Sequence, residues 1–232
     1  MTDWTGDDRP PPLNLRLREA AWFLPRIWRT FGSTRPIGPE DGPPALVIPG
    51  WVARDQSTAA LRRALADSGW RVHGWGNGIN WGARADTLEM LKRRLDEIGG
   101  PRRVLVVGWS LGGLFARELA RAVPERVRAV VTLGAPFSGD PKQNNVWRMY
   151  ERIAGHRVDD PPLPRITAKP PVPCLALWSR KDGLIAPRAA RGLDDERDAE
   201  VELKCTHMAF GVSPKAAREV VREIDSFLKN RA

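Results

Sequence analysis

The 232-residue chain has few of the residues that most often carry redox or metal chemistry, with two cysteines and three histidines. They form no cluster with metal-ligand spacing, so the sequence predicts no metal site. Cys174 and Cys205 are expected at opposite ends of neighbouring parallel strands, too far apart for a disulfide. Two free, buried thiols are typical of a protein in a reducing compartment.

The chain also lacks a long apolar run and a signal peptide. No run approaches the ~18 apolar residues that a membrane span requires. Residues 1–8 are acidic and polar, whereas a signal peptide begins with a basic segment and an apolar core. Hydrophobic residues make up 42% and charged residues 28% of the chain, which is ordinary for a globular protein. These features predict a cytoplasmic protein.

The formal net charge of +9 raises the question of an anionic partner. The excess of Lys and Arg is spread along the first half of the predicted fold and is not gathered in a basic tail. We interpret the charge as a solvated surface and predict no nucleic-acid binding. Attraction to acidic lipid or to an acidic carrier protein is the alternative interpretation.

Short apolar runs alternate with helix-forming segments over most of the chain. The predicted strands cover residues 45–49, 70–75, 102–107, 127–133, 173–179 and 199–204. The predicted helices cover about residues 57–68, 85–98, 112–122, 186–193 and 214–229. Such alternation predicts an α/β fold in which helices cover both faces of a mostly parallel, twisted sheet.

Two segments depart from this alternation. Residues 1–44 form an N-terminal arm in which apolar residues from Leu17 to Phe31 have helical spacing, with Pro25 expected to kink or split the helix. This helix either packs on the domain or lies on a membrane surface, which would give peripheral lipid contact. Within the domain formed by residues 45–232, residues 134–172 are predicted to form a lid or cap insertion, with one helix near residues 146–153.

A serine between glycines lies where a predicted strand meets a predicted helix, in Gly108-Trp109-Ser110-Leu111-Gly112-Gly113. The pattern alone is weak, because such a serine could simply cap the helix. Between a buried strand and a helix it is typical of a nucleophile elbow, whose strained turn lifts the hydroxyl above the sheet edge. A serine nucleophile then needs a base, and the base needs an orienting acid.

The three histidines make the search for the base short. His207 follows the last predicted strand, in a loop before the final helix, which is where this type of site places its base. His73 lies within a predicted strand and is expected to be packed there. His156 lies in the insertion, where it could contact substrate but is more simply explained as a surface residue.

The acid should follow an earlier strand that ends at the same edge of the sheet. Asp182 comes directly after the predicted strand 173–179 and is the expected acid, although an Asp-Gly pair can also be an ordinary turn. Asp140 follows an earlier strand and is the alternative. With Asp182, the three residues occur in the order Ser110, acid, His207.

Several motifs together resemble bacterial lipase/esterase-like members of the α/β-hydrolase superfamily, from about residue 44 onward. They are Val47-Ile48-Pro49-Gly50-Trp51, the serine motif, Thr132-Leu133-Gly134-Ala135-Pro136-Phe137 and Thr206-His207-Met208. The resemblance implies an α/β-hydrolase fold with an oxyanion hole formed by the N–H groups of Trp51 and Leu111. Pro49 stands where many relatives carry histidine, a departure that leaves the Trp51 N–H in place.

The chain has ten tryptophans, several of them at or beyond the predicted ends of strands on the catalytic edge. Trp81, Trp109 and Trp147 are the predicted substrate-binding residues. Aromatic side chains around one pocket suit an apolar acyl group or an aromatic group.

These observations predict a serine hydrolase that cleaves small-molecule carboxylic esters through Ser110, Asp182 and His207, by an acyl-enzyme and without a cofactor. One alternative is the same triad acting on a thioester or on an acyl ester linked to a carrier protein. The other is a non-catalytic α/β-hydrolase that serves as a binding module.

Overall fold

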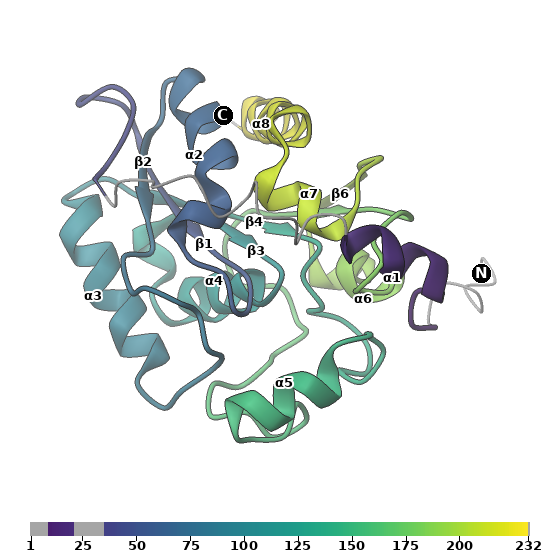
Figure 1. Cartoon of the computed structure of the whole chain (residues 1–232). Coiled ribbons are helices and arrows are strands. Elements are labelled where there is room, and N and C mark those ends of the chain that lie inside the picture. The colour runs from purple at the N-terminus through teal and green to yellow at the C-terminus, as the bar shows by residue number, and fades with distance from the viewer. Residues whose placement is uncertain (1–8, 21–34, 232) are drawn as a thin grey trace.

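The computed structural model describes residues 9–20 and 35–231. Its strands form one six-stranded sheet in the order β2-β1-β3-β4-β5-β6, and every neighbouring pair is parallel (Figure 1). The strands are β1 (Pro44–Ile48), β2 (Arg71–Gly74), β3 (Val104–Trp109), β4 (Val127–Leu133), β5 (Cys174–Trp178) and β6 (Ala199–Glu202). The predicted parallel α/β architecture is therefore confirmed.

Helices cover both faces of the sheet. They are α1 (Leu13–Ala20), α2 (Ala59–Asp67), α3 (Thr87–Gly99), α4 (Leu111–Ala122), α5 (Trp147–Ala154), α6 (Pro187–Arg191), α7 (His207–Val212) and α8 (Pro214–Lys229). Short 3-10 helices lie at Asp55–Thr58, Pro124–Arg126 and Asp194–Glu196. In Figure 1, α2 and α8 lie on one side of the sheet and α3 and α4 on the other.

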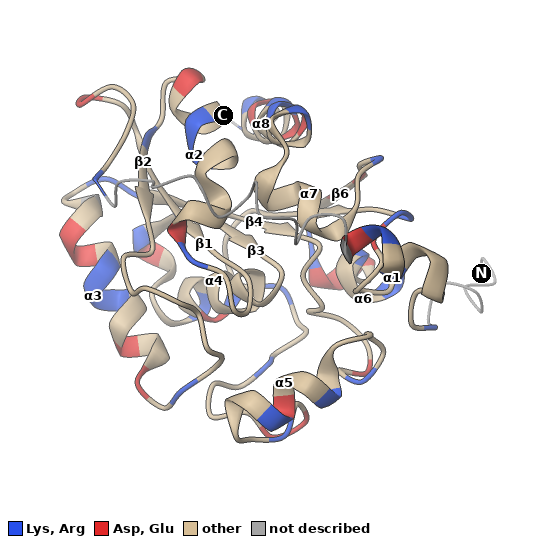
Figure 2. Cartoon of the chain, viewed as in Figure 1, with Lys and Arg blue, Asp and Glu red and all other residues tan. Residues whose placement is uncertain are grey.

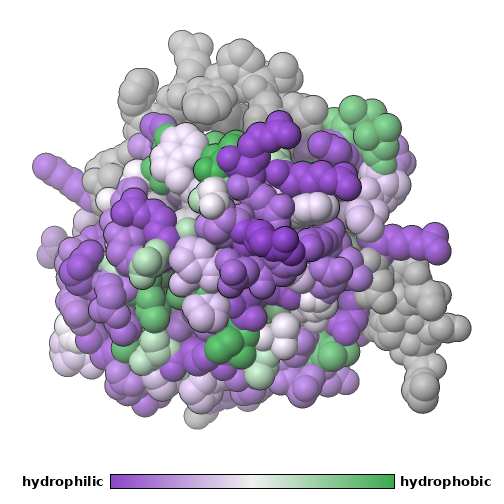
Figure 3. All heavy atoms as spheres, turned by 90° about the horizontal axis from the view of Figure 1, so that it is seen from below, coloured by the Kyte–Doolittle hydropathy of each residue, from purple (hydrophilic) through white to green (hydrophobic). Residues whose placement is uncertain are grey.

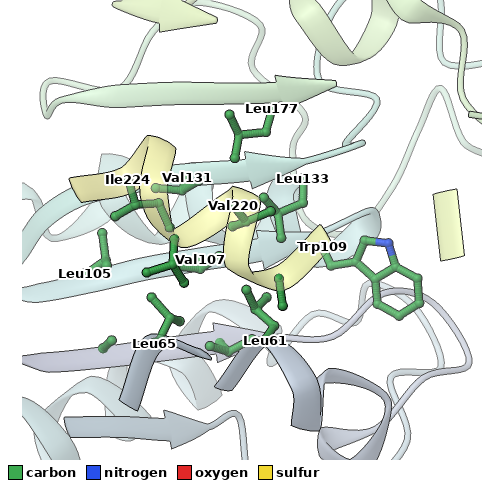
Figure 4. Packing of buried hydrophobic residues seen from close by; sticks show 14 of the residues in the cluster. Leu61, Leu65, Leu105, Val107, Trp109, Val131, Leu133, Leu177, Val220 and Ile224 are labelled. Carbon is green, nitrogen blue, oxygen red and sulfur yellow. The ribbon is translucent and has the colours of Figure 1, made fainter. Parts of the chain in front are cut away.

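Alternation of side chains along each strand builds two cores, one on each face. Ala45 and Val47 of β1 pack with Leu61 and Leu65 of α2 and with apolar residues of α8. Figure 4 shows this layer, with Val220 and Ile224 of α8 facing the strands. The intervening residues of β1 face the opposite layer, which α3 and α4 cover.

The order of strands creates a crevice at the carboxyl edge of the sheet. From β1 the chain crosses to β2 on one side and then returns to β3 on the other side of β1. The loops that follow β1 and β3 therefore leave the sheet in different directions, and such switch points are where open α/β sheets bind ligands. Ser110 follows β3 directly, and Trp51 lies three residues beyond β1.

The insertion between β4 and β5 carries α5, which lies outside the two helical layers in Figure 1. Hydrogen bonds attach it to the domain: the Tyr150 hydroxyl accepts from the N–H of Ala83 at 3.1 Å, and Asn145 donates to the Gly183 carbonyl at 3.0 Å. These contacts hold the insertion against the loops that follow β2 and β5.

The N-terminal arm is described only as far as Ala20, where α1 ends. The predicted continuation through Pro25 to Phe31 lies outside the described residues. Glu19 on α1 is buried against the domain, so this part of the arm packs on the fold. Within the described ranges, no helix is long and apolar enough to cross a bilayer.

Charges of both signs share the surface. Lys and Arg lie beside Asp and Glu on α3, α5 and α8 (Figure 2). On the face seen from below, hydrophobic areas are small and separate within a mostly hydrophilic surface (Figure 3).

Both cysteines are free, but only Cys174 is buried. Cys205 is partly exposed, contrary to the prediction, because it lies in the loop after β6.

Candidate active site

Ser110 occupies a strained turn between β3 and α4. Its φ of 53° and ψ of −122° are unusual for a residue with a side chain. Glycines make the turn possible: a Cβ on Gly108 would lie 2.2 Å from the Gly112 carbonyl oxygen, and one on Gly112 would lie 2.3 Å from that of Ile48. The strain and the close packing are those of a nucleophile elbow.

Asp182 and His207 form a buried pair, each 2% exposed. The Asp182 Oδ2 atom lies 2.7 Å from His207 Nδ1, and its Oδ1 accepts the N–H groups of Leu184 and Ile185 at 2.8 Å each. Because the carboxylate accepts, Nδ1 carries the proton, and Nε2 of the neutral ring is left as the basic atom. Among the described residues, the His207 side chain forms its hydrogen bond with Asp182.

His207 begins the short helix α7 and does not lie in a loop, which corrects the sequence prediction. Burial lowers the pKa of His207, but the Asp182 carboxylate, its hydrogen bond and the charge of Glu19 outweigh burial and raise that pKa above its usual value.

Gly134 lies against the Asp182–His207 pair. A Cβ on Gly134 would be 2.9 Å from Asp182 Oδ2 and 3.1 Å from His207 Nδ1.

The loop after β1 brings a second backbone amide to the serine. A Cβ placed on Gly50 would lie 3.1 Å from the Cβ of Ser110, so the two loops are in contact. Within the described residues, neither the Trp51 nor the Leu111 amide donates to a backbone carbonyl. An oxyanion hole formed by these two amides stays a prediction.

Asn80 braces this loop and was missed by the sequence analysis. The buried side-chain amide of Asn80 donates to the Pro49 carbonyl at 2.9 Å, and the backbone carbonyl of Asn80 accepts the Val52 N–H at 2.7 Å. Val52 has a positive φ of 57°, a second strained non-glycine residue beside the site. The turn signals around residue 80 gave no hint of this role, because it depends on a contact with a segment 31 positions earlier.

A pocket opens beside Ser110 and, with the solvent space at its mouth, measures about 760 Å³. Its walls come from the loop after β1, from α4 and, above all, from the insertion. Insertion residues in the wall include Val146, Trp147, Tyr150, Val158 and Leu163. Trp51 also lines it and packs edge-to-face on Tyr150, with ring centroids 5.6 Å apart.

The predicted substrate-binding tryptophans divide. Trp147 lines the pocket, whereas Trp81 is 53% exposed and Trp109 is 3% exposed, and neither lines it. Trp109 points to the α8 side because it alternates along β3 with the pocket-side residues, and its indole donates to the His207 carbonyl at 3.1 Å. Asn80 takes the inward position in the next loop and leaves Trp81 on the surface.

The alternative candidates lie away from the pair. Asp140 is exposed, and its carboxylate accepts the N–H of Lys142 at 2.8 Å. His156 bonds to the Ala83 carbonyl at 3.1 Å and to the Tyr150 hydroxyl at 3.4 Å, so it fastens the lid. His73 is packed in β2, as predicted, and burial lowers its pKa to about 4.

Known proteins with similar sequences include the pimeloyl-[acyl-carrier protein] methyl ester esterase of Aliivibrio fischeri, which is 31% identical over 116 residues. The match covers 48% of this chain and 40% of that enzyme, so the chain matches less than half of its relative's length.

Solved structures show the same fold. The naproxen esterase (carboxylesterase NP) of Bacillus subtilis has a TM-score of 0.56 at 18% identity, with 82% of this chain and 85% of that one covered. A thioesterase domain from the curacin biosynthetic pathway has a TM-score of 0.57 at 15% identity, covering 81% and 93%. A family model for the alpha/beta hydrolase fold matches residues 43–162, more than half of the chain. The protein therefore belongs to the α/β-hydrolase family.

Proposed function

We propose that the protein is a serine hydrolase of carboxylic esters, with Ser110 as nucleophile, His207 as base and Asp182 as orienting acid. The observation that carries the proposal is the buried Asp182–His207 pair at the sheet edge where Ser110 occupies its strained turn. Esterases and a thioesterase among proteins of the same fold support hydrolysis of an acyl group.

In this mechanism, His207 Nε2 takes the Ser110 proton as the hydroxyl oxygen attacks the substrate carbonyl. The N–H groups of Trp51 and Leu111 donate to the oxygen that becomes negative. Protonated His207 is stabilised by Asp182 and gives its proton to the leaving alcohol. Water activated by the same imidazole then cleaves the acyl-enzyme, which releases the acid and restores Ser110.

The pocket indicates the class of substrate. The aromatic and aliphatic residues of the insertion supply most of its wall, with Trp147 among them. We therefore propose small esters with an apolar or aromatic acyl group.

The test is reaction with a fluorophosphonate probe and hydrolysis of p-nitrophenyl esters of increasing chain length. Wild type should label and turn over, and Ser110→Ala should do neither. Ser68→Ala, which removes an exposed serine directly after the last residue of α2, is the matched control and should behave as wild type. Unlabelled but folded wild type would favour the non-catalytic binding module, and labelled Ser110→Ala would refute the assigned nucleophile.

An acyl group carried on an acidic protein is the second candidate substrate. It is supported by the similarity to an esterase that acts on an acyl-carrier-protein ester and by the net charge of +9. Turnover of acyl-carrier substrate should fall steeply between low and high salt, because screening weakens attraction between oppositely charged proteins. Equal salt dependence for carrier-linked and p-nitrophenyl esters would contradict it.

We also propose a cytoplasmic location, which the free thiols support, and peripheral lipid contact through the N-terminal arm. Leu13 and Leu17 of α1 are 67% and 64% exposed, so α1 presents apolar side chains outward. The protein should co-sediment with phosphatidylglycerol vesicles more than with phosphatidylcholine vesicles. A full chain that stays in the supernatant with both would contradict lipid contact.

A further inference from the structure

A carboxylate from the N-terminal arm is buried directly behind the candidate catalytic pair. Glu19 lies in the last turn of α1 and is 1% exposed. Its Oε1 accepts the N–H of His207 at 2.7 Å and that of Gly183 at 3.0 Å. Its Oε2 accepts the N–H of Met208 at 3.0 Å. Three backbone donors therefore converge on one side chain that precedes them by more than 160 positions.

These donors belong to the loop that carries the proposed acid and to the first turn of α7, which carries the proposed base. Gly183 follows Asp182 in the chain, and the His207 N–H belongs to the base itself. One carboxylate thus ties together the backbone on both sides of the Asp182–His207 hydrogen bond. Removing it would leave three N–H groups without their acceptor and free the two segments to move apart.

Further contacts fix α1 at this place. A Cβ on Gly183 would lie 2.4 Å from the Leu15 carbonyl oxygen, so the backbone of α1 lies against the acid loop. Asn145, which lies in the insertion just before α5, donates to the Pro11 carbonyl at 2.8 Å and to the Gly183 carbonyl at 3.0 Å. The arm, the acid loop and the lid are therefore joined around Gly183.

We propose that Glu19 is a positioning residue of the active site, which holds Asp182 and His207 in register from outside the hydrolase domain. The proposal rests on the proposed esterase function. It makes the N-terminal arm part of the catalytic machinery, since the arm supplies the acceptor for both segments. It also predicts that changes to the arm alter catalysis at a site that the arm does not line.

The charge of Glu19 gives a signature that packing alone would not produce. The charged groups that face His207 are Asp182, from the loop after β5, and Glu19, from α1. The nearby Cys205 thiol remains protonated, because its partial burial and the neighbouring carboxylates raise its pKa to about 12. Loss of the Glu19 charge should therefore lower the pKa of His207, so that the base stays active to lower pH.

The experiment measures the rate constant of fluorophosphonate labelling from about pH 5 to pH 9 in the full chain, at a temperature where circular dichroism shows every variant folded. Glu19→Gln should slow labelling about tenfold or more and shift the acid limb to lower pH. Glu19→Asp keeps the charge and should recover the wild-type limb, with part of the rate. Arg18→Gln removes the exposed neighbouring charge and should match wild type.

The outcomes separate this proposal from the proposed function. Wild type that fails to label, or Ser110→Ala that labels, overturns the catalytic assignment and this role with it. Wild type that labels through Ser110, with Glu19→Gln matching its rate and acid limb, overturns the positioning role alone. If Glu19→Gln does not fold, Gly183→Ala, which pushes α1 away, should show the same loss and shift; unchanged labelling would overturn the role.

Discussion

Gly134 gives a sharp test of the proposed active-site geometry, because it touches the candidate catalytic pair, Asp182 and His207, without belonging to it. Its φ is +53°, and an added Cβ would lie 2.9 Å from Asp182 Oδ2 and 3.1 Å from His207 Nδ1. Both distances are below normal van der Waals contact. Gly134→Ala must therefore displace the carboxylate, the imidazole or the loop itself by a few tenths of an ångström or more.

The magnitude follows from two separate effects. A left-handed φ on a residue with a Cβ costs about 1–2 kcal/mol, which lowers the melting temperature of a chain of this size by about 2–8 °C. Displacement of the catalytic pair acts on the rate, and a shift approaching 1 Å costs about 10²-fold. We expect Gly134→Ala to fold and to lose labelling and ester turnover by that order.

Gly100→Ala is the matched control. Gly100 has a φ of +51°, nearly that of Gly134, but nothing lies within 4 Å of an added Cβ. The control should show the same loss of melting temperature and wild-type rates of labelling and turnover. If folded Gly134→Ala reacts like wild type, the Asp182–His207 pair is not the catalytic pair; if both variants lose activity equally, strain explains the loss.

Three further predictions concern the pocket, the core and pH. Trp147→Ala should raise KM for aryl or long-chain esters about tenfold, whereas exposed Trp81→Ala should leave it unchanged, as a chain-length series of esters would show. Arg117, buried on α4, donates to three backbone carbonyls, so Arg117→Met should lower the free energy of unfolding by about 3 kcal/mol in urea titrations; a change below about 0.5 kcal/mol would contradict this. Burial, and then the charges of Arg94 and Arg71, lower the pKa of His73 from 6.5 to about 4. As the pH is lowered from 6.5 to 4, the unfolded chain therefore takes up a proton before the folded chain does, and the free energy of unfolding decreases. His73→Val should lessen that fall in urea midpoints measured at pH 7, 5 and 4.

Sequence patterns predicted the parts of the site that are set by their position after a strand. Ser110 and Asp182 could be placed because apolar runs mark β3 and β5, and the carboxyl ends of parallel strands meet at one edge. The oxyanion roles of Trp51 and Leu111 come instead from the resemblance of the motifs around them, and they stay predictions. The pairing of Asp182 with His207, in preference to Asp140, needed the structure, because both carboxylates follow strands.

The parts that sequence patterns missed depend on contacts between distant segments. Helix α7 has only six residues and contains Gly211, so local propensity favours a loop. Its first N–H groups are accepted by Glu19, 188 positions earlier. Asn80 braces the oxyanion loop in the same long-range way. Trp109 shows the value of side-chain alternation, because its place in β3 puts it in the same layer as Leu105 and Val107 and away from the pocket.

Most of the pocket wall and the proposed triad come from different parts of the chain, so the proposed mechanism separates the choice of substrate from the chemistry. Ser110, Asp182 and His207 follow strands β3, β5 and β6 of the domain, and Glu19 of the arm adds its contacts at Gly183, His207 and Met208. The insertion supplies much of the pocket wall and is attached through contacts such as Tyr150 to Ala83. Substitutions in the insertion can therefore change which acyl group fits while labelling of Ser110 by a small probe stays constant. Asn145 bridges these parts, because its side chain donates both to the Gly183 carbonyl of the acid loop and to the Pro11 carbonyl of the arm. A change in the position of the insertion would thus be felt directly at the acid loop and also at the arm.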